Sequence, residues 1–187
     1  MTIEAARIPS DRVPEYQAVQ ISFEVVSTFV AQADGQGSFR LVEHPVGSPY
    51  TKNYDAISET PAEWADRFDT SRWTLLLARD DDRCIGGATV AVDTPAVELL
   101  EGRDDLALLW DIRVAPAYRG RGIGQSLFAA AEAVAAAQGC RELKVETQNI
   151  NVAACRFYAA MGCTLRAVRE NAYPACPGEA QFLWYKA

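Results

Sequence analysis

The chain has 187 residues, 49% apolar and 10% aromatic, and its 25 acidic side chains outnumber the 18 basic ones, for a formal net charge of −7. A chain of this length and composition can bury a sizeable core as one domain, which excludes disordered and low-complexity proteins. The acidic balance disfavours nucleic-acid binding, which needs a basic surface, and favours small-molecule or cationic partners.

The cysteine and hydropathy patterns indicate a cellular compartment. The five cysteines include no CxxC pair and no Cys/His cluster, so we expect neither a disulfide framework nor a metal site. Residues 1–14 lack the apolar segment of a signal peptide, and no apolar run approaches the roughly 20 residues that span a bilayer. We therefore expect a cytoplasmic protein without membrane contact. The single histidine, His44, is expected at the surface, which removes most triad chemistry.

The first predicted elements form a β-hairpin. Residues 21–30 and 38–43 are rich in Val, Ile, Phe and Thr, and they flank the turn-forming residues 34–37. A helix over residues 23–30 is the alternative. Residues 44–55 collect prolines, a glycine and polar turn residues, which predicts a loop.

A capping box begins the next predicted element. Thr60 is expected as N-cap, Pro61 at the first helical position and Glu63 as the reciprocal partner of a short helix over residues 64–68. Strand-like runs follow, joined by short acidic turns, at residues 73–79, 84–92 and 106–114. Because the connections are short, we predict an antiparallel meander.

The C-terminal part alternates helices and strands. An alanine-rich helix runs from Gly124 to a stop at Gly139, and a second helix runs from Asn151 as N-cap to Gly162 as C-cap. Strands are expected around these helices at residues 142–147, 163–169 and 181–185. The predicted fold is mixed α/β (α+β), with a mostly antiparallel central sheet flanked by helices and one parallel step, in a single domain over residues 1–187.

A glycine-rich loop before the alanine-rich helix indicates an anion site. Its sequence is Arg119-Gly120-Arg121-Gly122-Ile123-Gly124. Glycines leave backbone N–H groups unobstructed at a helix N-terminus, where the helix dipole favours an anion such as a phosphorylated ligand. Neither GxxxxGK[ST] nor GxGxxG is present, because Gln125 stands where the third glycine of the latter would be. An ordinary glycine-rich turn is the alternative.

Two sequence blocks resemble one protein family. The pattern Arg119-x-x-Gly122-x-Gly124, between a strand and a helix, resembles the pyrophosphate-binding signature of the GCN5-related N-acetyltransferase (GNAT) family, which uses acetyl-CoA. Downstream, Asn151-x-x-Ala154-x-x-Phe157-Tyr158-x-x-x-Gly162 resembles the later helix of that family, in which the asparagine and the aromatic face the cofactor.

The resemblance covers residues 106–169 and implies a GNAT-like N-acetyltransferase domain. The sheet would splay at the acetyl-CoA site, and residues 1–70 would be an elaboration on the acceptor side. Acetyl-CoA would contact the backbone of Ile112, Arg113 and Val114, the loop from Arg119 to Gly124 and, on the later helix, Asn151, Ala154 and Phe157. Arg113, Arg119 and Arg121 would gather where the acidic cofactor lies.

The resemblance also implies an acid for the reaction. Tyr158 matches the tyrosine that protonates the leaving thiolate, and a phenol with a pKa of about 10 is close enough to a thiol for this transfer. A core aromatic is the alternative for Tyr158.

Candidate bases are two carboxylates within apolar strands, Asp111 and Glu146. In a common cleft they would bind a cationic acceptor and accept its proton, directly or through water. Facing solvent, or pairing with Arg113 and Lys144, is the alternative. We expect the acceptor to contact Trp110 and Tyr54 as well as both carboxylates.

A narrower resemblance concerns the acceptor. The segments 145–158, 162–163, 182–186 and 49–54 are similar to the streptothricin acetyltransferase branch of the family, whose members acetylate an amino group of a strongly cationic antibiotic. A small cationic amine is therefore the expected partner and acetyl-CoA the cosubstrate. The alternatives are another small amine or polyamine as acceptor, and an acetyl-CoA-binding regulator without turnover. The sequence leaves open a homodimer through the C-terminal strands.

Overall fold

The computed structural model describes residues 1–8, 10–35 and 37–187, which form two compact units. The first unit comprises Met1–Ile21 and Asn53–Leu143, and the second comprises Ser22–Lys52 and Lys144–Ala187. Elements of the first unit are β1 (Thr2–Arg7), α1 (Val13–Gln17), η1 (Tyr54–Ala56), α2 (Trp64–Arg67), β4 (Thr74–Asp80), β5 (Arg83–Val92), η2 (Glu98–Leu100), β6 (Leu106–Val114), η3 (Pro116–Tyr118) and α3 (Ile123–Ala137). Elements of the second are β2 (Ser22–Ala33), β3 (Phe39–Asn53), most of β7 (Glu142–Gln148), α4 (Val152–Ala160), β8 (Thr164–Arg169) and β9 (Gln181–Lys186).

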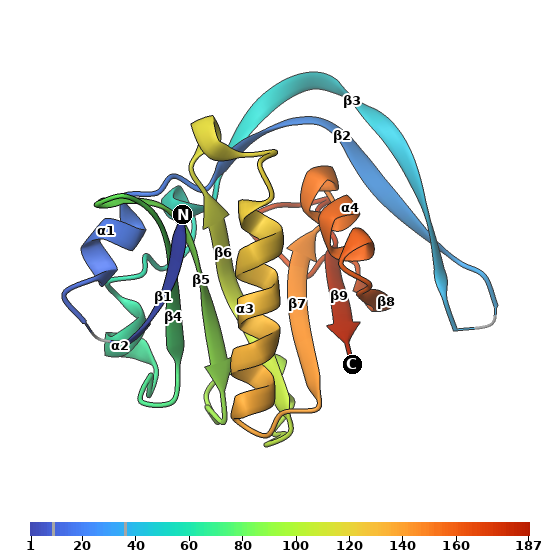
Figure 1. Ribbon diagram of the computed structural model, residues 1–187. Helices are drawn as coiled ribbons and strands as arrows, with labels where there is room; N and C mark the ends of the chain where they lie inside the picture. The colour runs from blue at the N-terminus through green and yellow to red at the C-terminus, as the bar shows by residue number, and fades with distance from the viewer. Residues whose placement is uncertain (9, 36) are drawn as a thin grey trace. The chain divides into compact units, whose positions relative to one another are not determined.

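The first unit is built on an antiparallel sheet in the strand order β1-β4-β5-β6. Helix α3 lies lengthwise across β4, β5 and β6, as Figure 1 shows, and buries Leu127, Phe128 and Ala131. A second core cluster gathers Tyr16 of α1, Trp64 of α2 and apolar side chains of β4, among them Leu75 and Leu77. Because β4 and β5 bury side chains in succession, both strands read as continuous apolar runs.

The predicted meander is confirmed, and one strand was missed. The expected run over residues 106–114 coincides with β6, and the acidic turn between β4 and β5 contains Asp81 at φ 49°. Strand β1, which pairs with β4, was not predicted, because Glu4 and Arg7 interrupt any apolar pattern at the N-terminus. Its burial is only partial, as expected for an edge strand.

In the second unit, β9 lies between β7 and β8, and β8 and β9 are antiparallel. Helix α4 begins after the predicted N-cap, Asn151, and ends one residue earlier than predicted, with Met161 instead of Gly162 as its C-cap. The side chain of Asn151 caps it by accepting a hydrogen bond from the Ala154 N–H at 3.1 Å, and Gly162 beyond its end has φ +80°.

Strands β2 and β3 form a two-stranded sheet that Figure 1 shows as a long curved ribbon. The predicted hairpin is confirmed and the alternative helix is wrong, while Gln36 of the expected turn lies outside the described residues. The loop predicted over residues 44–55 is wrong, because β3 continues to Asn53 through Pro45 and Pro49. Both strands of such a ribbon have an edge without ladder bonds, so prolines are tolerated there. His44 lies exposed on β3.

The predicted capping box is half present. The Glu63 carboxylate accepts from the Thr60 N–H at 2.8 Å and from the Thr60 hydroxyl at 2.7 Å, but α2 begins only at Trp64, with Glu63 as its N-cap. The hydroxyl of Thr60 therefore stabilises the turn before the helix instead of capping the helix.

Candidate acetyl-CoA and acceptor residues

The glycine loop has the conformation that an anion site requires. Gly120 and Gly122 have φ values of +74° and +82°, and Gly122 is the N-cap of α3 without a side-chain cap bond. No atom lies within 4 Å of a Cβ added at Gly120, and at Gly122 only Gln125 Oε1 does, at 3.7 Å. The backbone conformation therefore selects these glycines, and the loop surface stays open for a ligand. The first N–H groups of α3 lack intrahelical partners, which suits the diphosphate of a coenzyme.

The loop arginines are exposed. The Nε of Arg119 donates to the carbonyl of Val114 at 2.9 Å, which fastens the loop to the end of β6. The guanidinium of Arg121 lies 5.3 Å from the centroid of the Tyr118 ring. Both side chains thus lie on the surface of the same loop as the open N–H groups.

Arg113 differs from its expected place beside an acidic cofactor. Its side chain is only 2% exposed and binds Asp111 through two bonds, Nε to Oδ1 at 2.9 Å and Nη2 to Oδ2 at 2.6 Å. Nη1 donates to Asp55 Oδ1 at 3.0 Å and to the Val19 carbonyl at 3.1 Å. Burial opposes the charge, but the bonds from Asp111 and its attraction outweigh burial and raise the pKa of Arg113. The buried guanidinium of Arg113 therefore joins β6 to the segments that contain Val19 and Asp55.

Asp111 is paired, which was one of the two alternatives from the sequence. Besides Arg113, the hydroxyl of Tyr16 donates to Asp111 Oδ1. Burial, followed by the charge of Asp111, raises the pKa of this fully buried tyrosine. Both carboxylate oxygens of Asp111 therefore already accept hydrogen bonds within the first unit.

Strand β6 carries an irregularity at Trp110. Thr89 pairs with Asp111 but Val90 pairs with Leu109, so Trp110 has no direct partner. Its ring packs into an aromatic cluster, with centroids 5.1 Å from Trp73, 5.2 Å from Phe68 and 6.3 Å from Trp64. Ile112 and Val114 follow in regular register with Ala88 and Gly86, and Tyr54 lies in η1 beside Asp55.

Helix α4 carries, in the second unit, the remaining residues that the sequence predicts as cofactor contacts. The Asn151 oxygen is used by the helix cap to Ala154, so the helix itself explains this asparagine. Tyr158 is 4% exposed, and its ring centroid lies 5.2 Å from that of Phe157 in an edge-on arrangement. The phenol is therefore held in one orientation, whether it acts as an acid or packs the core.

Glu146, on β7, has a partner that the sequence did not indicate. The hydroxyl of Tyr173 donates to Glu146 Oε1. Burial raises the pKa of the Glu146 carboxyl, and the bond from Tyr173 partly opposes this rise. A carboxylate with a raised pKa is better matched to proton transfer near neutral pH. Tyr173 lies in an irregular segment, where no periodicity could have identified it.

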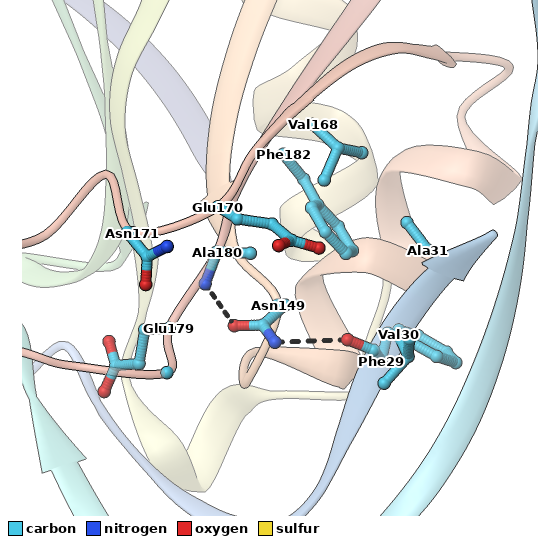
Figure 2. Close-up of a pocket in the computed structure, with 11 residues that line it drawn as sticks. Phe29, Val30, Ala31, Asn149, Val168, Glu170, Asn171, Glu179, Ala180 and Phe182 are labelled. Carbon is cyan, nitrogen blue, oxygen red and sulfur yellow. Dashed lines mark hydrogen bonds between the residues drawn. The ribbon is translucent and has the colours of Figure 1, made fainter. Parts of the chain in front are cut away.

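That segment, residues 170–180 between β8 and β9, is called here the β8–β9 connection. Together with β2 and β9 it lines a cavity of about 250 Å³ whose walls include Phe29 and Phe182. Figure 2 shows Asn149 between Ala180 and Phe29, bonded to both. Glu179 of the connection also contributes to the lining.

Candidate metal clusters and membrane-spanning helices are both absent from the described part of the chain. Within it, no three His, Cys, Asp or Glu side chains gather in a way that could hold a metal ion. No helix among the described residues is long and apolar enough to cross a membrane.

Comparison with known proteins gives consistent matches. The model of the acetyltransferase (GNAT) family matches residues 40–163. The chain is 29% identical over 178 residues to a streptothricin acetyltransferase of Escherichia coli, covering 94% of this chain and 91% of that protein. It is 27% identical over 151 residues to streptothricin acetyltransferase A of Bacillus subtilis (strain 168), covering 80% of each.

Solved structures agree along the whole chain. The crystal structure of nourseothricin acetyltransferase has a TM-score of 0.74 and 26% identity, covering 99% of this chain and 98% of that one. A structure from Bacillus anthracis str. Ames, in complex with acetyl coenzyme A, has a TM-score of 0.78 and 20% identity, covering 99% of each chain. The predicted fold class, a mixed and mostly antiparallel sheet with a parallel step and flanking helices, is confirmed by this likeness.

Proposed function

Since the chain belongs to the GNAT family of acetyltransferases, we propose that it acetylates a primary amine of a small cationic molecule of the streptothricin type. Family membership makes the protein an N-acetyltransferase that uses acetyl-CoA. The acceptor and the roles of individual residues are the proposal. The observation that carries it is the 29% identity to a streptothricin acetyltransferase over 94% of the chain.

The residues present fit a bound coenzyme. The left-handed glycines leave the N-terminus of α3 uncapped, and the exposed Arg119 and Arg121 lie on the same loop. The N–H groups of this loop, from Gly120 to Gly124, would hold the diphosphate, with the two guanidinium groups adding charge. The backbone of Ile112 to Val114 on β6, and Asn151, Ala154 and Phe157 on α4, would contact the rest.

Acetyl-CoA supplies an acetyl group activated as a thioester. The bound ammonium group first releases a proton to solvent, so that the nitrogen attacks as a neutral amine. As its bond to the acetyl carbon forms, the nitrogen loses a second proton, which Glu146 accepts. As the carbon–sulfur bond breaks, the sulfur takes a proton from the hydroxyl of Tyr158. Proton return through solvent restores both side chains. Glu146 is favoured over Asp111 as the base, because Arg113 and Tyr16 already occupy both oxygens of Asp111.

A cationic acceptor agrees with the charge of the protein. The net charge of −7 attracts cations over a long range, and a carboxylate base next to the acceptor stabilises an ammonium group before transfer. Asp111, Trp110 and Tyr54 are proposed as further acceptor contacts. Of these, Trp110 would contribute shape and Asp111 negative charge to the surface that contacts the acceptor.

The test is thiol release from acetyl-CoA across a panel of amines. The panel holds a streptothricin, simple primary amines, polyamines and short peptides. We expect the highest kcat/KM for the streptothricin. Turnover of peptides alone would overturn the small-molecule proposal, and faster turnover of polyamines would move the acceptor class to polyamines. The variant Gly122→Asp, which places a carboxylate in the anion site, is the matched control for acetyl-CoA dependence.

A further inference from the structure

The contact between Tyr173 and Glu146 joins an irregular segment to a candidate base. Tyr173 lies in the β8–β9 connection, which is eleven residues long. Its hydroxyl donates a hydrogen bond to the carboxylate of Glu146 on β7. A hydrogen bond to a carboxylate fixes the side-chain rotamer and favours its charged form. Both effects matter for a group that must accept a proton at a defined point.

The β8–β9 connection is anchored on the C-terminal side of this contact. The side-chain oxygen of Asn149 accepts a hydrogen bond from the Ala180 N–H at 2.8 Å, and the backbone N–H of Asn149 donates to the Ala180 carbonyl at 2.9 Å. Lys52 Nζ lies 2.8 Å from Glu179 Oε1 and 3.2 Å from Cys176 Sγ. The side chains of Lys52 and Glu179 are only 10% and 11% exposed. Such a buried pair restrains the connection more than a surface ion pair would.

The anchors transmit this restraint to Tyr173. The N–H of Cys176 donates to the carbonyl of Tyr173 at 2.9 Å, and the N–H of Glu179 donates to the carbonyl of Cys176 at 3.1 Å. Successive turns thus lead from the Lys52 pair to the tyrosine. The hydroxyl is presented to Glu146 by a braced backbone.

The thiol of Cys155 on α4 is neutral. Burial, with a smaller effect of the Glu146 charge, raises the pKa of this thiol to about 11. Among the described residues, Glu146 has no ion pair, and Tyr173 is its hydrogen-bond partner from the β8–β9 connection. The charge on Glu146 therefore depends on the tyrosine hydroxyl.

We propose that Tyr173 is a positioning residue, whose hydroxyl orients the Glu146 carboxylate toward the acceptor and keeps it ready to accept a proton. This inference rests on the proposed role of Glu146 as the base. Tyr173 itself needs no contact with the reacting atoms. The β8–β9 connection is thereby assigned a part in catalysis that its irregular sequence does not reveal.

The variant Tyr173→Phe removes only the hydroxyl. Without this donor, burial acts on Glu146 unopposed, so the pKa of the carboxyl rises further. A hydrogen bond to a charged group corresponds to a shift of about one pH unit. The acidic limb of the kcat profile should move up by this amount, with an unchanged KM for acetyl-CoA. The exposed tyrosine of β3, changed as Tyr50→Phe, is the matched control.

A direct titration separates the inference from the proposed function. The carboxyl carbons of glutamate are labelled, Glu146→Gln identifies the Glu146 signal, and the midpoint is measured by NMR without any turnover. We expect an upward shift in Tyr173→Phe and none in Tyr50→Phe. Tyr173→Leu is titrated in the same way, so that the result does not depend on one folded variant.

The outcomes are distinct. If Glu146→Gln is inactive but Tyr173→Phe moves neither the titration nor the acidic limb, the inference about Tyr173 is wrong and the proposed base stands. If Glu146→Gln keeps the wild-type pH profile, the proposed base is wrong and the inference falls with it. A shift of both the midpoint and the acidic limb in Tyr173→Phe supports the inference.

Discussion

The buried guanidinium of Arg113 gives a sharp test, because the sequence suggested a cofactor contact and the structure places it in an ion-pair network. In Arg113→Met, Asp111 and Asp55 lose their partner and the Val19 carbonyl loses a donor. The exposed fractions of the Arg113 and Asp111 side chains are 2% and 11%, so solvent replaces little of what is lost.

Removing one partner of a buried ion pair costs about 3–5 kcal/mol in free energy of unfolding. In a domain of this size each kcal/mol lowers Tm by roughly 2–4 °C, so a fall of roughly 6–20 °C is expected. The double variant Arg113→Met with Asp111→Leu should recover part of this loss, because the uncompensated charge is gone.

The assay combines thermal unfolding with calorimetric titration of acetyl-CoA. Arg113→Met should lower Tm strongly and leave the acetyl-CoA Kd of the folded fraction within a few-fold. Arg121→Met, at an exposed loop position, should show the opposite pattern, with Tm unchanged and Kd raised. Wild-type Tm together with a large rise in Kd for Arg113→Met would refute the structural role and restore the cofactor contact.

Three further predictions concern the loop, the acid and the base. Gly122→Ala should lose about 1–2 kcal/mol of stability, because Gly122 has φ +82° in the left-handed region. Gly122→Asp should in addition abolish acetyl-CoA binding. Unchanged acetyl-CoA binding of Gly122→Asp in calorimetric titrations would contradict the assignment of the loop. Tyr158→Phe should lower kcat by about 10²-fold or more with little change in acetyl-CoA KM, and a wild-type kcat would leave Tyr158 as a core aromatic. The pKa of Glu146 is raised by burial in the folded state, so this carboxyl favours folding when protonated and opposes it as pH rises through that pKa. The free energy of unfolding of Glu146→Gln should therefore exceed that of the wild type at neutral pH, and this difference should vanish below the ordinary pKa of a glutamate. A difference that does not change with pH in denaturant unfolding would contradict the effect of burial.

Local signals in the sequence predicted the regular elements well. The apolar run of β6, the N-cap Asn151 of α4 and the left-handed Gly162 just beyond its C-cap each mark a boundary, because strand burial and helix capping depend on nearby residues. Strand β3 was misjudged because Pro45 and Pro49 usually break strands, and only pairing with β2 shows that a free edge tolerates them.

The partners of the charged groups depend on long-range contacts. The chain separates Tyr16 from Asp111 by 95 positions and Lys52 from Glu179 by 127, so no spacing rule could connect them. The sequence did offer pairing between Asp111 and Arg113 as an alternative, since they are two positions apart on one strand. Tyr173 was missed because a lone aromatic in an irregular segment carries no pattern.

Acetylation of the proposed acceptor is tested most directly by mass spectrometry of the products that the wild-type protein forms from acetyl-CoA and a streptothricin. We expect a product that has gained one acetyl group on an amine, that forms catalytically, and that is absent with Gly122→Asp. If the wild-type protein binds acetyl-CoA but forms no acetylated product from the streptothricin or from any other small amine, the proposed acceptor class is contradicted.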